Sequence, residues 1–354
     1  MIGMSNEFFT FSAFLIIILG ILLVDLLVIG RRSHEVSFRE SLVWSGIWIS
    51  LALLFSLYLY YFGETLHGIR NMEDLARISS EYAPSLRINP EDFDRSLEIY
   101  RKHIVITYLT GYLIEESLSV DNLFVIMTIL HSFSVRKADY KKVLFWGILG
   151  AIVMRFIFIF AGSALIHRFE WVLYIFGLYL LYTGISMYLK RNKEKQIQPN
   201  DHWLVKFLSR RVRIFPRYVA GRFFIKKGNA VFLTPLMVVL LIIEFSDLIF
   251  ALDSIPAIFG ITRDPFIVFF SNVFAILGLR SLFFLLVNVV DKFYLLKVGI
   301  SGLLVFIGLK MILNDYLISL GYKPFYSLIV ILFILTSSIV LSVIFPKKME
   351  VVKN

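Results

Sequence analysis

The sequence contains no cysteine among its 354 residues. This absence excludes disulfide bonds, thiolate metal ligands and cysteine nucleophiles. The six histidines are scattered, and no two of them have the HExxH spacing of a zinc hydrolase. A GxxxxGK(S/T) loop for ATP phosphates is also missing. We therefore expect no enzyme, no ATP-driven pump and no bound cofactor.

Charged residues are scarce as well, at 18% of the chain, whereas 58% of the residues are hydrophobic. A soluble domain usually carries about 25% charged and 45–50% apolar residues. A soluble protein of this composition would expose far too much apolar surface to water. An aromatic content of 16% does not suit a disordered chain either. The composition predicts an all-α polytopic membrane protein.

Nine apolar stretches approach the roughly 20 residues that a helix needs to cross a bilayer. They lie at 8–29, 41–62, 104–131, 143–166, 170–189, 231–253, 266–290, 293–313 and 324–345. The first stretch does not look like a cleaved signal, because it is long, lacks a basic n-region and contains Asp25. We therefore expect about nine transmembrane helices.

The Lys and Arg residues of the connecting segments predict the orientation, because cytoplasmic loops carry an excess of them. Segment 190–230 is strongly basic, whereas segment 63–103 carries more acidic than basic residues. This pattern places the N-terminus outside and the C-terminus in the cytoplasm of a cell membrane, the inner membrane in a bacterium. A loop facing anionic lipid explains the net charge of +10 without a nucleic-acid partner.

The spans and links divide the chain into six parts. These are two N-terminal helices (1–62), an external loop with a short helix near 90–102 (63–103), a first three-helix repeat (104–189), a basic cytoplasmic loop (190–230), a second repeat (231–313), and a C-terminal helix with a short cytoplasmic tail (314–354). The short helix is expected because Asn89 and Pro90 form a typical helix start.

The two three-helix units share a pattern of polar residues within apolar sequence. The matched pairs are Glu115 with Asp247, Asp121 with Asp253, Asn122 with Ser254, and Arg155 with Arg280. Because each unit has an odd number of spans, the second copy enters the membrane from the opposite side. The sequence thus predicts an inverted-topology repeat, an architecture found in many secondary transporters.

Ionisable side chains inside a membrane are costly and usually face a partner or a pathway. The acids in predicted spans are Asp25, Glu115, Glu116, Asp121, Glu244, Asp247 and Asp253. Their excess over the mid-span arginines favours a bound cation, or protonation of several carboxyl groups. A purely structural set of hydrogen bonds and ion pairs is the alternative. We expect Arg155 and Arg280 each to pair with an acid when no cation is bound.

The predicted metal ligands are Glu115, Asp121, Glu244, Asp247 and Asp253, with Asp25, Ser117, Asn122, Ser246 and Ser254 as supporting polar groups. Such an all-oxygen site suits hard divalent cations, which prefer carboxylate, carbonyl and water ligands.

The spacing of the acids limits how they can share one ion. Along a straight helix, Asp121 lies about 9 Å and 120° away from Glu115. Either a helix breaks, for which Pro256 is a candidate, or the antiparallel repeats pair the acids across copies. In the second case Glu115 would lie near Asp253. Asp121 would correspondingly lie near Asp247.

These segments resemble the TerC family of integral membrane proteins, which is placed among LysE-like transporters. Residues 115–122 match the family pattern E-x-S-L-x-V-D-N, and residues 244–257 match E-x-S-D-x-x-F-A-x-D-S-I-P-A. The run 262–280 is also similar, and the resemblance covers roughly 104–313. The first pattern leaves position 116 variable, so Glu116 is the weakest of the acids. The resemblance implies manganese handling, because several members export Mn²⁺.

Together these features predict a secondary transporter that exports a divalent cation, with manganese first, through an acidic site at the membrane midplane and coupled to protons. The alternatives are a calcium transporter, or a membrane scaffold linked to tellurium resistance whose protein partners bind through 190–230. An intramembrane hydrolase would need two close carboxylates and a water, and no nucleophile motif accompanies the acids.

Overall fold

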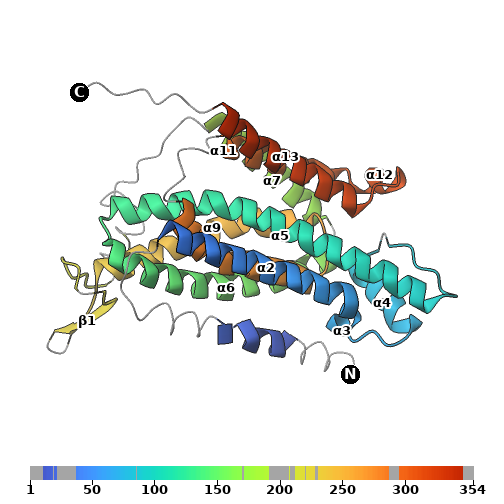
Figure 1. The fold of residues 1–354 in the computed structure, drawn as a ribbon, viewed down its shortest axis with the longest axis horizontal. Coiled ribbons are helices and arrows are strands. Elements are labelled where there is room, and N and C mark those ends of the chain that lie inside the picture. The colour runs from blue at the N-terminus through green and yellow to red at the C-terminus, as the bar shows by residue number, and fades with distance from the viewer. Residues whose placement is uncertain are drawn as a thin grey trace.

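The computed structural model describes residues 11–18, 20–21, 37–84, 86–169, 171–190, 207, 212–219, 221–227, 230–286 and 295–345. The described chain is almost entirely helical (Figure 1). Its named helices are α2 (Phe38–Phe62), α3 (Glu64–His67), α4 (Met72–Tyr82), α5 (Phe93–Ser132), α6 (Lys137–Arg168), α7 (Val172–Lys190), α9 (Pro235–Phe259), α10 (Pro265–Leu286), α11 (Leu296–Ile312), α12 (Asn314–Ser319) and α13 (Pro324–Ile344). The all-α membrane fold class is confirmed.

Six of the described helices are long and apolar enough to cross a membrane, namely α2, α6, α7, α9, α10 and α13. Two further predicted spans, 104–131 and 293–313, fall on α5 and α11. The first predicted span lies mostly outside the described residues, and so does Asp25. The count of nine transmembrane helices therefore stays a prediction.

The helices pack in two groups. Helices α2, α5, α6, α9 and α10 form a bundle, with α10 buried between α2, α5 and α6. Helices α7, α11 and α13 lie together along one side of this bundle, against α5 and α9 (Figure 1). Glycines let α7 and α11 approach closely, since a Cβ on Gly184 would lie 2.8 Å from the carbonyl oxygen of Ser301.

The two predicted triplets, α5–α7 and α9–α11, contact each other reciprocally. Each helix packs against its counterpart, with α5 on α9, α6 on α10 and α7 on α11, and α5 also meets α10 as α6 meets α9. Two units related by a two-fold axis would make such paired contacts. The inverted repeat itself remains a prediction, and these contacts are compatible with it.

The short helix expected near 90–102 is the beginning of a much longer one. Helix α5 starts at Phe93, where the side chain of Asp92 accepts a hydrogen bond from the Arg95 amide at 3.0 Å, and runs to Ser132 without a break. No Gly or Pro lies within its first 18 residues, so nothing ends the helix before the membrane. The segment 63–103 also contains α3 and α4, which were not predicted.

Helix α9 begins and ends differently from the predicted span 231–253. Residues 230–233 form strand β2, and Thr234 caps the helix ahead of Pro235 at its first position. Pro256 lies inside the helix, which continues to Phe259. The proposed helix break at Pro256 is therefore wrong: the flanking turns hold the helical path although proline cannot donate a backbone hydrogen bond.

The described part of the basic loop folds onto the turn between α5 and α6. Strands β1 (Phe224–Lys227) and β2 (Ala230–Leu233) form an antiparallel hairpin. Lys142 Nζ donates to the carbonyl oxygen of Gly221 at 2.6 Å, and the Tyr218 hydroxyl donates to that of Phe133 at 2.6 Å. Burial raises the pKa of Tyr218, so its hydroxyl stays protonated and able to donate.

Candidate functional site

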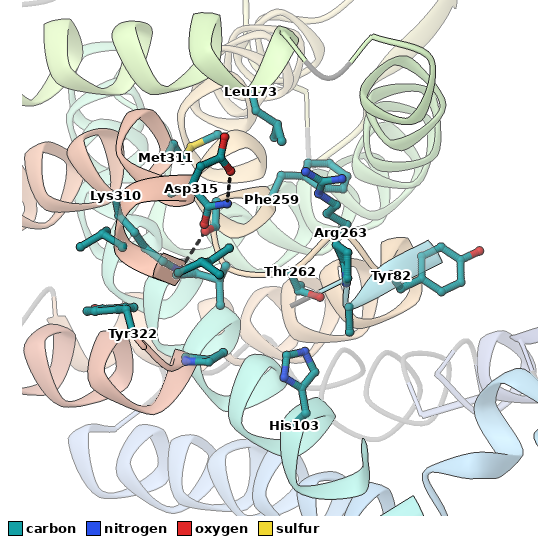
Figure 2. Close-up of a pocket in the computed structure, with 18 of the residues that line it drawn as sticks. Tyr82, His103, Leu173, Phe259, Thr262, Arg263, Lys310, Met311, Asp315 and Tyr322 are labelled. Atoms are coloured by element: carbon teal, nitrogen blue, oxygen red, sulfur yellow. Dashed lines mark hydrogen bonds between the residues drawn. The ribbon is translucent and has the colours of Figure 1, made fainter. Parts of the chain in front are cut away.

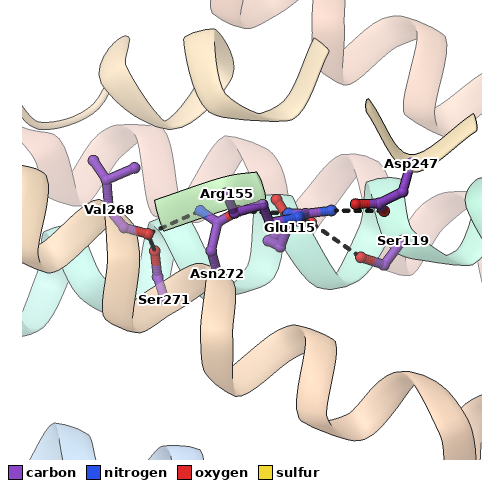
Figure 3. Close-up of polar contacts among 7 residues, drawn as sticks. All are labelled: Glu115, Ser119, Arg155, Asp247, Val268, Ser271 and Asn272. Carbon is purple, nitrogen blue, oxygen red and sulfur yellow. Dashed lines mark hydrogen bonds and ion pairs between the residues drawn. The ribbon is translucent and has the colours of Figure 1, made fainter. Parts of the chain in front are cut away.

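Four helices of the bundle meet at one buried guanidinium group. Arg155 of α6 and Glu115 of α5 are both 0% exposed and form an ion pair (Figure 3). The Arg155 Nη1 atom also donates to Asn272 Oδ1 of α10 at 2.5 Å, and Nη2 donates to Asp247 Oδ1 of α9 at 3.4 Å. One cation thus connects two carboxylates, one from each predicted triplet. We call these four residues the Arg155 cluster.

Both carboxylates of the Arg155 cluster keep an oxygen available. Glu115 Oε2 and Asp247 Oδ2 are buried and accept no hydrogen bond from the described residues. Ser119 donates to the other oxygen of Glu115 at 3.1 Å. Leaving a buried polar atom unsatisfied costs about 1–3 kcal/mol, and more for a charged group. A proton, or a cation that displaces Arg155, would therefore be stabilised at these two oxygens.

Asn272 was not among the residues predicted for the site. Its Nδ2 atom donates to the carbonyl oxygen of Val268 one turn earlier at 2.8 Å, and this bond points Oδ1 at Arg155. The residue is fully buried. The available signal was a neutral amide in the middle of an apolar span, within the run 262–280 that resembles the family.

Glu244 precedes Asp247 by one turn of α9 and faces the same helix, α6. A Cβ added to Gly150 would overlap the Glu244 carboxylate, so the two positions are in direct contact. Gly150 lies five residues before Arg155 on α6. The predicted shared face of Glu244 and Asp247 is therefore present: both acids approach α6, Glu244 at Gly150 and Asp247 at Arg155.

Asp253 lies at a separate place on α9. Its carboxylate is a hydrogen-bond neighbour of the Tyr179 hydroxyl on α7, a second residue that was not predicted. In the structure, Arg155 connects Glu115 to Asp247. The antiparallel pairing had instead predicted Asp253 as the neighbour of Glu115. The difference depends on the rotation of α9 about its axis: Asp247 and Asp253 point about 120° apart, and Asp247 is the acid that faces Arg155.

The remaining predicted ligands divide into three kinds. The side chain of Asp121 lies outside what the structure describes, although its backbone belongs to α5. Asn122 and Ser254, which directly follow Asp121 and Asp253 in the sequence, are buried. Asn122 Nδ2 and Ser254 Oγ have no hydrogen-bond partner among the described residues. The hydroxyls of Ser117 and Ser246 instead donate to the carbonyl four residues earlier, at 2.5 and 2.8 Å.

Arg280 does not occupy a place equivalent to that of Arg155. It lines a small pocket beside α2 together with Glu40, Trp44 and Lys141. Glu116 faces α10 near this region, since a Cβ on Gly278 would lie 3.9 Å from its Oε1 atom. Arg280 is therefore not a member of the Arg155 cluster, and its predicted pairing with an acid of the site stays a prediction.

Across the residues that the structure describes, no group of three His, Asp or Glu side chains is arranged to hold a metal ion. Arg155 lies between the two carboxylates that a cation would bridge. Binding a cation between Glu115 and Asp247 would therefore require Arg155 to move, because a guanidinium and a metal ion cannot neutralise the same oxygens.

Comparison of the sequence with models of known protein families identifies the family of the chain. Residues 100–350 match the model of the "Integral membrane protein TerC family". The chain belongs to the TerC family. The matched region begins within α5 and contains all four residues of the Arg155 cluster and every named helix from α6 to α13. The resemblance found in the sequence motifs is therefore confirmed.

Relatives of this TerC-family chain are membrane proteins of similar length. An uncharacterized membrane protein of Myxococcus xanthus is 40% identical over 94% of this chain and 91% of its own. The proposed membrane-bound redox modulator Alx of Escherichia coli K12 is 42% identical over 86% of both chains. An uncharacterized membrane protein of Rickettsia felis is 35% identical over 94% of this chain and 96% of its own. No solved structure matches the chain.

Proposed function

We propose that this TerC-family protein is a secondary transporter that exports a divalent metal cation, with Mn²⁺ as the first candidate and Ca²⁺ as the second. The observation that carries the proposal is the Arg155 cluster. A buried arginine holds Glu115 and Asp247 from different helices, and each acid keeps one buried oxygen that accepts no hydrogen bond within the described part of the chain. An arrangement built only to join helices would be expected to satisfy those oxygens.

The cluster lies across the contact between the two predicted triplets. Glu115 and Arg155 come from α5 and α6, whereas Asp247 and Asn272 come from α9 and α10. Rocking of one triplet against the other, as in alternating access, would change these bonds directly. A site of this kind can sense which way the transporter is open.

Exchange of partners at Arg155 gives a mechanism. Breaking a buried ion pair by removing one partner costs about 3–5 kcal/mol. An incoming cation that binds Glu115 and Asp247 replaces the positive charge as Arg155 withdraws towards Asn272. Protons arriving at the carboxylates would release the cation, since a protonated carboxyl group is a poor ligand for a hard metal ion. Coupling to protons follows from this competition.

The name of the Alx relatives can be reconciled with metal transport. In this chain a redox effect could not involve thiols, because cysteine is absent. Export of a redox-active metal would change the redox state of a cell without any redox group in the transporter. The name therefore does not require a catalytic role for this protein.

Transport by purified protein in proteoliposomes tests the proposal. Mn²⁺ and Ca²⁺ flux would be followed with an imposed pH gradient, for the unchanged chain and for Glu115→Gln and Asp247→Asn. We expect saturable Mn²⁺ flux that depends on the pH gradient and falls at least tenfold in both variants. Glu98→Gln is the matched control, because Glu98 lies on the same helix α5 but pairs with Lys102 on an exposed surface.

Unchanged flux in both acid variants would remove the Arg155 cluster from the mechanism. The scaffold alternative predicts the opposite pattern. In that case deletion within 190–230 would abolish function in cells, while the acid substitutions would leave it intact.

A further inference from the structure

A cavity of about 370 Å³ lies at the end of the bundle opposite to the β-hairpin. Its walls come from α5, from the link between α9 and α10, and from α11 and α12 (Figure 2). The polar side chains that line it include those of His103, Thr262, Arg263, Lys310, Asn314 and Asp315. By the predicted orientation this is the external end, far from the Arg155 cluster along the helices.

Lys310 is the unusual member of this lining. The residue is only 7% exposed. Its Nζ atom donates a hydrogen bond to the carbonyl oxygen of Gly260 at 3.0 Å. An ammonium group has three protons to donate. Among the described residues no acid forms an ion pair with Lys310. A buried charge without a counter-charge is costly, so the cavity beside it is a place where an anion would be stabilised.

The acids near the cavity are already engaged. Asp315 accepts a hydrogen bond from the Tyr174 hydroxyl at 3.1 Å, and Asn314 donates to it at 3.4 Å. Asp264 contacts the buried His67 ring at 2.9 Å. Its other oxygen caps the first turn of α10. Neither carboxylate neutralises Lys310, and the lining also contains the guanidinium of Arg263.

We propose that this cavity binds a small oxyanion of the carboxylate or phosphate class, with the Lys310 ammonium as its principal contact. Lys310 supplies an ammonium group, and Arg263 adds a guanidinium from the opposite wall (Figure 2). The hydroxyl of Thr262 and the amide of Asn314 are further hydrogen-bond donors on the lining. The volume accommodates one such ion with a few waters. This site is distinct from the Arg155 cluster and does not depend on metal transport.

Anion binding to the full-length protein tests the proposal in metal-free detergent solution. Sodium phosphate and sodium acetate would be titrated calorimetrically and in thermal unfolding, with sodium chloride at the same ionic strength as the reference. We expect saturable binding and a raised Tm with at least one of the two oxyanions, and the stronger of them identifies the class. Lys310→Met should weaken binding roughly tenfold or more, because a hydrogen bond to a charged group is lost.

Lys297→Met is the matched control, since Lys297 lies on the same helix α11 and faces the ring of Phe124 at 5.6 Å, away from the cavity. The control should bind the oxyanion as the unchanged protein does. Equal effects of oxyanion and chloride, or unchanged binding by Lys310→Met, would overturn the proposal. If Lys310→Met does not fold, Arg263→Gln replaces it, and unchanged binding by that variant would count against the site equally. Metal flux plays no part in this measurement, so its outcome is independent of the proposed transport.

Discussion

Arg155 carries one positive charge between the fully buried carboxylate of Glu115 and the partly buried carboxylate of Asp247, and the balance of these three groups can be tested directly. Arg155→Gln leaves both carboxylates without their cation. We expect a loss of about 3–5 kcal/mol in the free energy of unfolding. The double variant Arg155→Gln with Glu115→Gln should recover part of this loss. Strictly additive losses in unfolding experiments would show that the two side chains act independently.

Asn272 has a more limited role, because it contributes one uncharged acceptor to Arg155 at 2.5 Å. Asn272→Ala should cost about 1–3 kcal/mol in unfolding experiments, the typical penalty for a buried group left unsatisfied. Ser271→Ala is the control on the same turn, since the Ser271 hydroxyl donates to a carbonyl of its own helix at 3.0 Å. Equal effects of both substitutions would mean that Asn272 matters only through packing.

The members of the Arg155 cluster that carry a charge could be predicted from the sequence. Glu115, Asp247 and Arg155 stand out because ionisable groups within apolar spans are costly. Asn272 carries no charge and was missed. The partnership of Glu115 with Asp247 was also missed, because it depends on how α5 and α9 are rotated relative to α6. The rotation is set by packing, such as the contact of Glu244 with Gly150, and no local pattern encodes it.

Among the helices, α6 offers a clean test of how closely it must approach α9. A Cβ at Gly150 would overlap the Glu244 carboxylate, whereas a Cβ at Gly147 would lie 3.6 Å from the nearest atom, on Ile243. We therefore expect Gly150→Ala to displace the Glu244 carboxylate and reduce Mn²⁺ flux, with little loss of stability because the end of a flexible side chain can move aside. Gly147→Ala, one turn away, should be tolerated in both assays. If Gly150→Ala behaves like Gly147→Ala, the close contact of α6 with Glu244 is wrong.

Helices were predictable as apolar stretches but not in their exact extent. The polar first turns of α5 lie outside the span 104–131, because a search for apolar length ends where charges begin. Pro256 was read as a breaker, yet neighbouring turns keep α9 helical through it. The hairpin of β1 and β2 was missed because each strand has only four residues and half of β1 is lysine. Its position depends on contacts with the α5–α6 turn, which are distant in sequence.

On the scale of the whole molecule, composition alone was enough for the fold class, because an apolar chain of this kind can bury its surface only in lipid. The repeat of polar residues predicted two helix triplets; the inverted repeat stays a prediction, with which the reciprocal contacts of the helices are compatible. What the sequence could not provide was the second helix group of α7, α11 and α13. This group depends on glycine contacts that only the assembled structure reveals.

The orientation of the molecule in the membrane can be tested with single cysteines, because the natural chain has none. Glu98 on the first turns of α5 and Lys226 in the β-hairpin lie at opposite ends of the bundle (Figure 1). In intact cells a membrane-impermeant maleimide should label Glu98→Cys, whereas Lys226→Cys should react only after the membrane is permeabilised. The reverse pattern would invert the predicted topology and turn the cavity beside Lys310 towards the cytoplasm. Labelling of both positions from one side would contradict the three membrane crossings that the predicted topology assigns to α5, α6 and α7 between them, and with it the transport proposal.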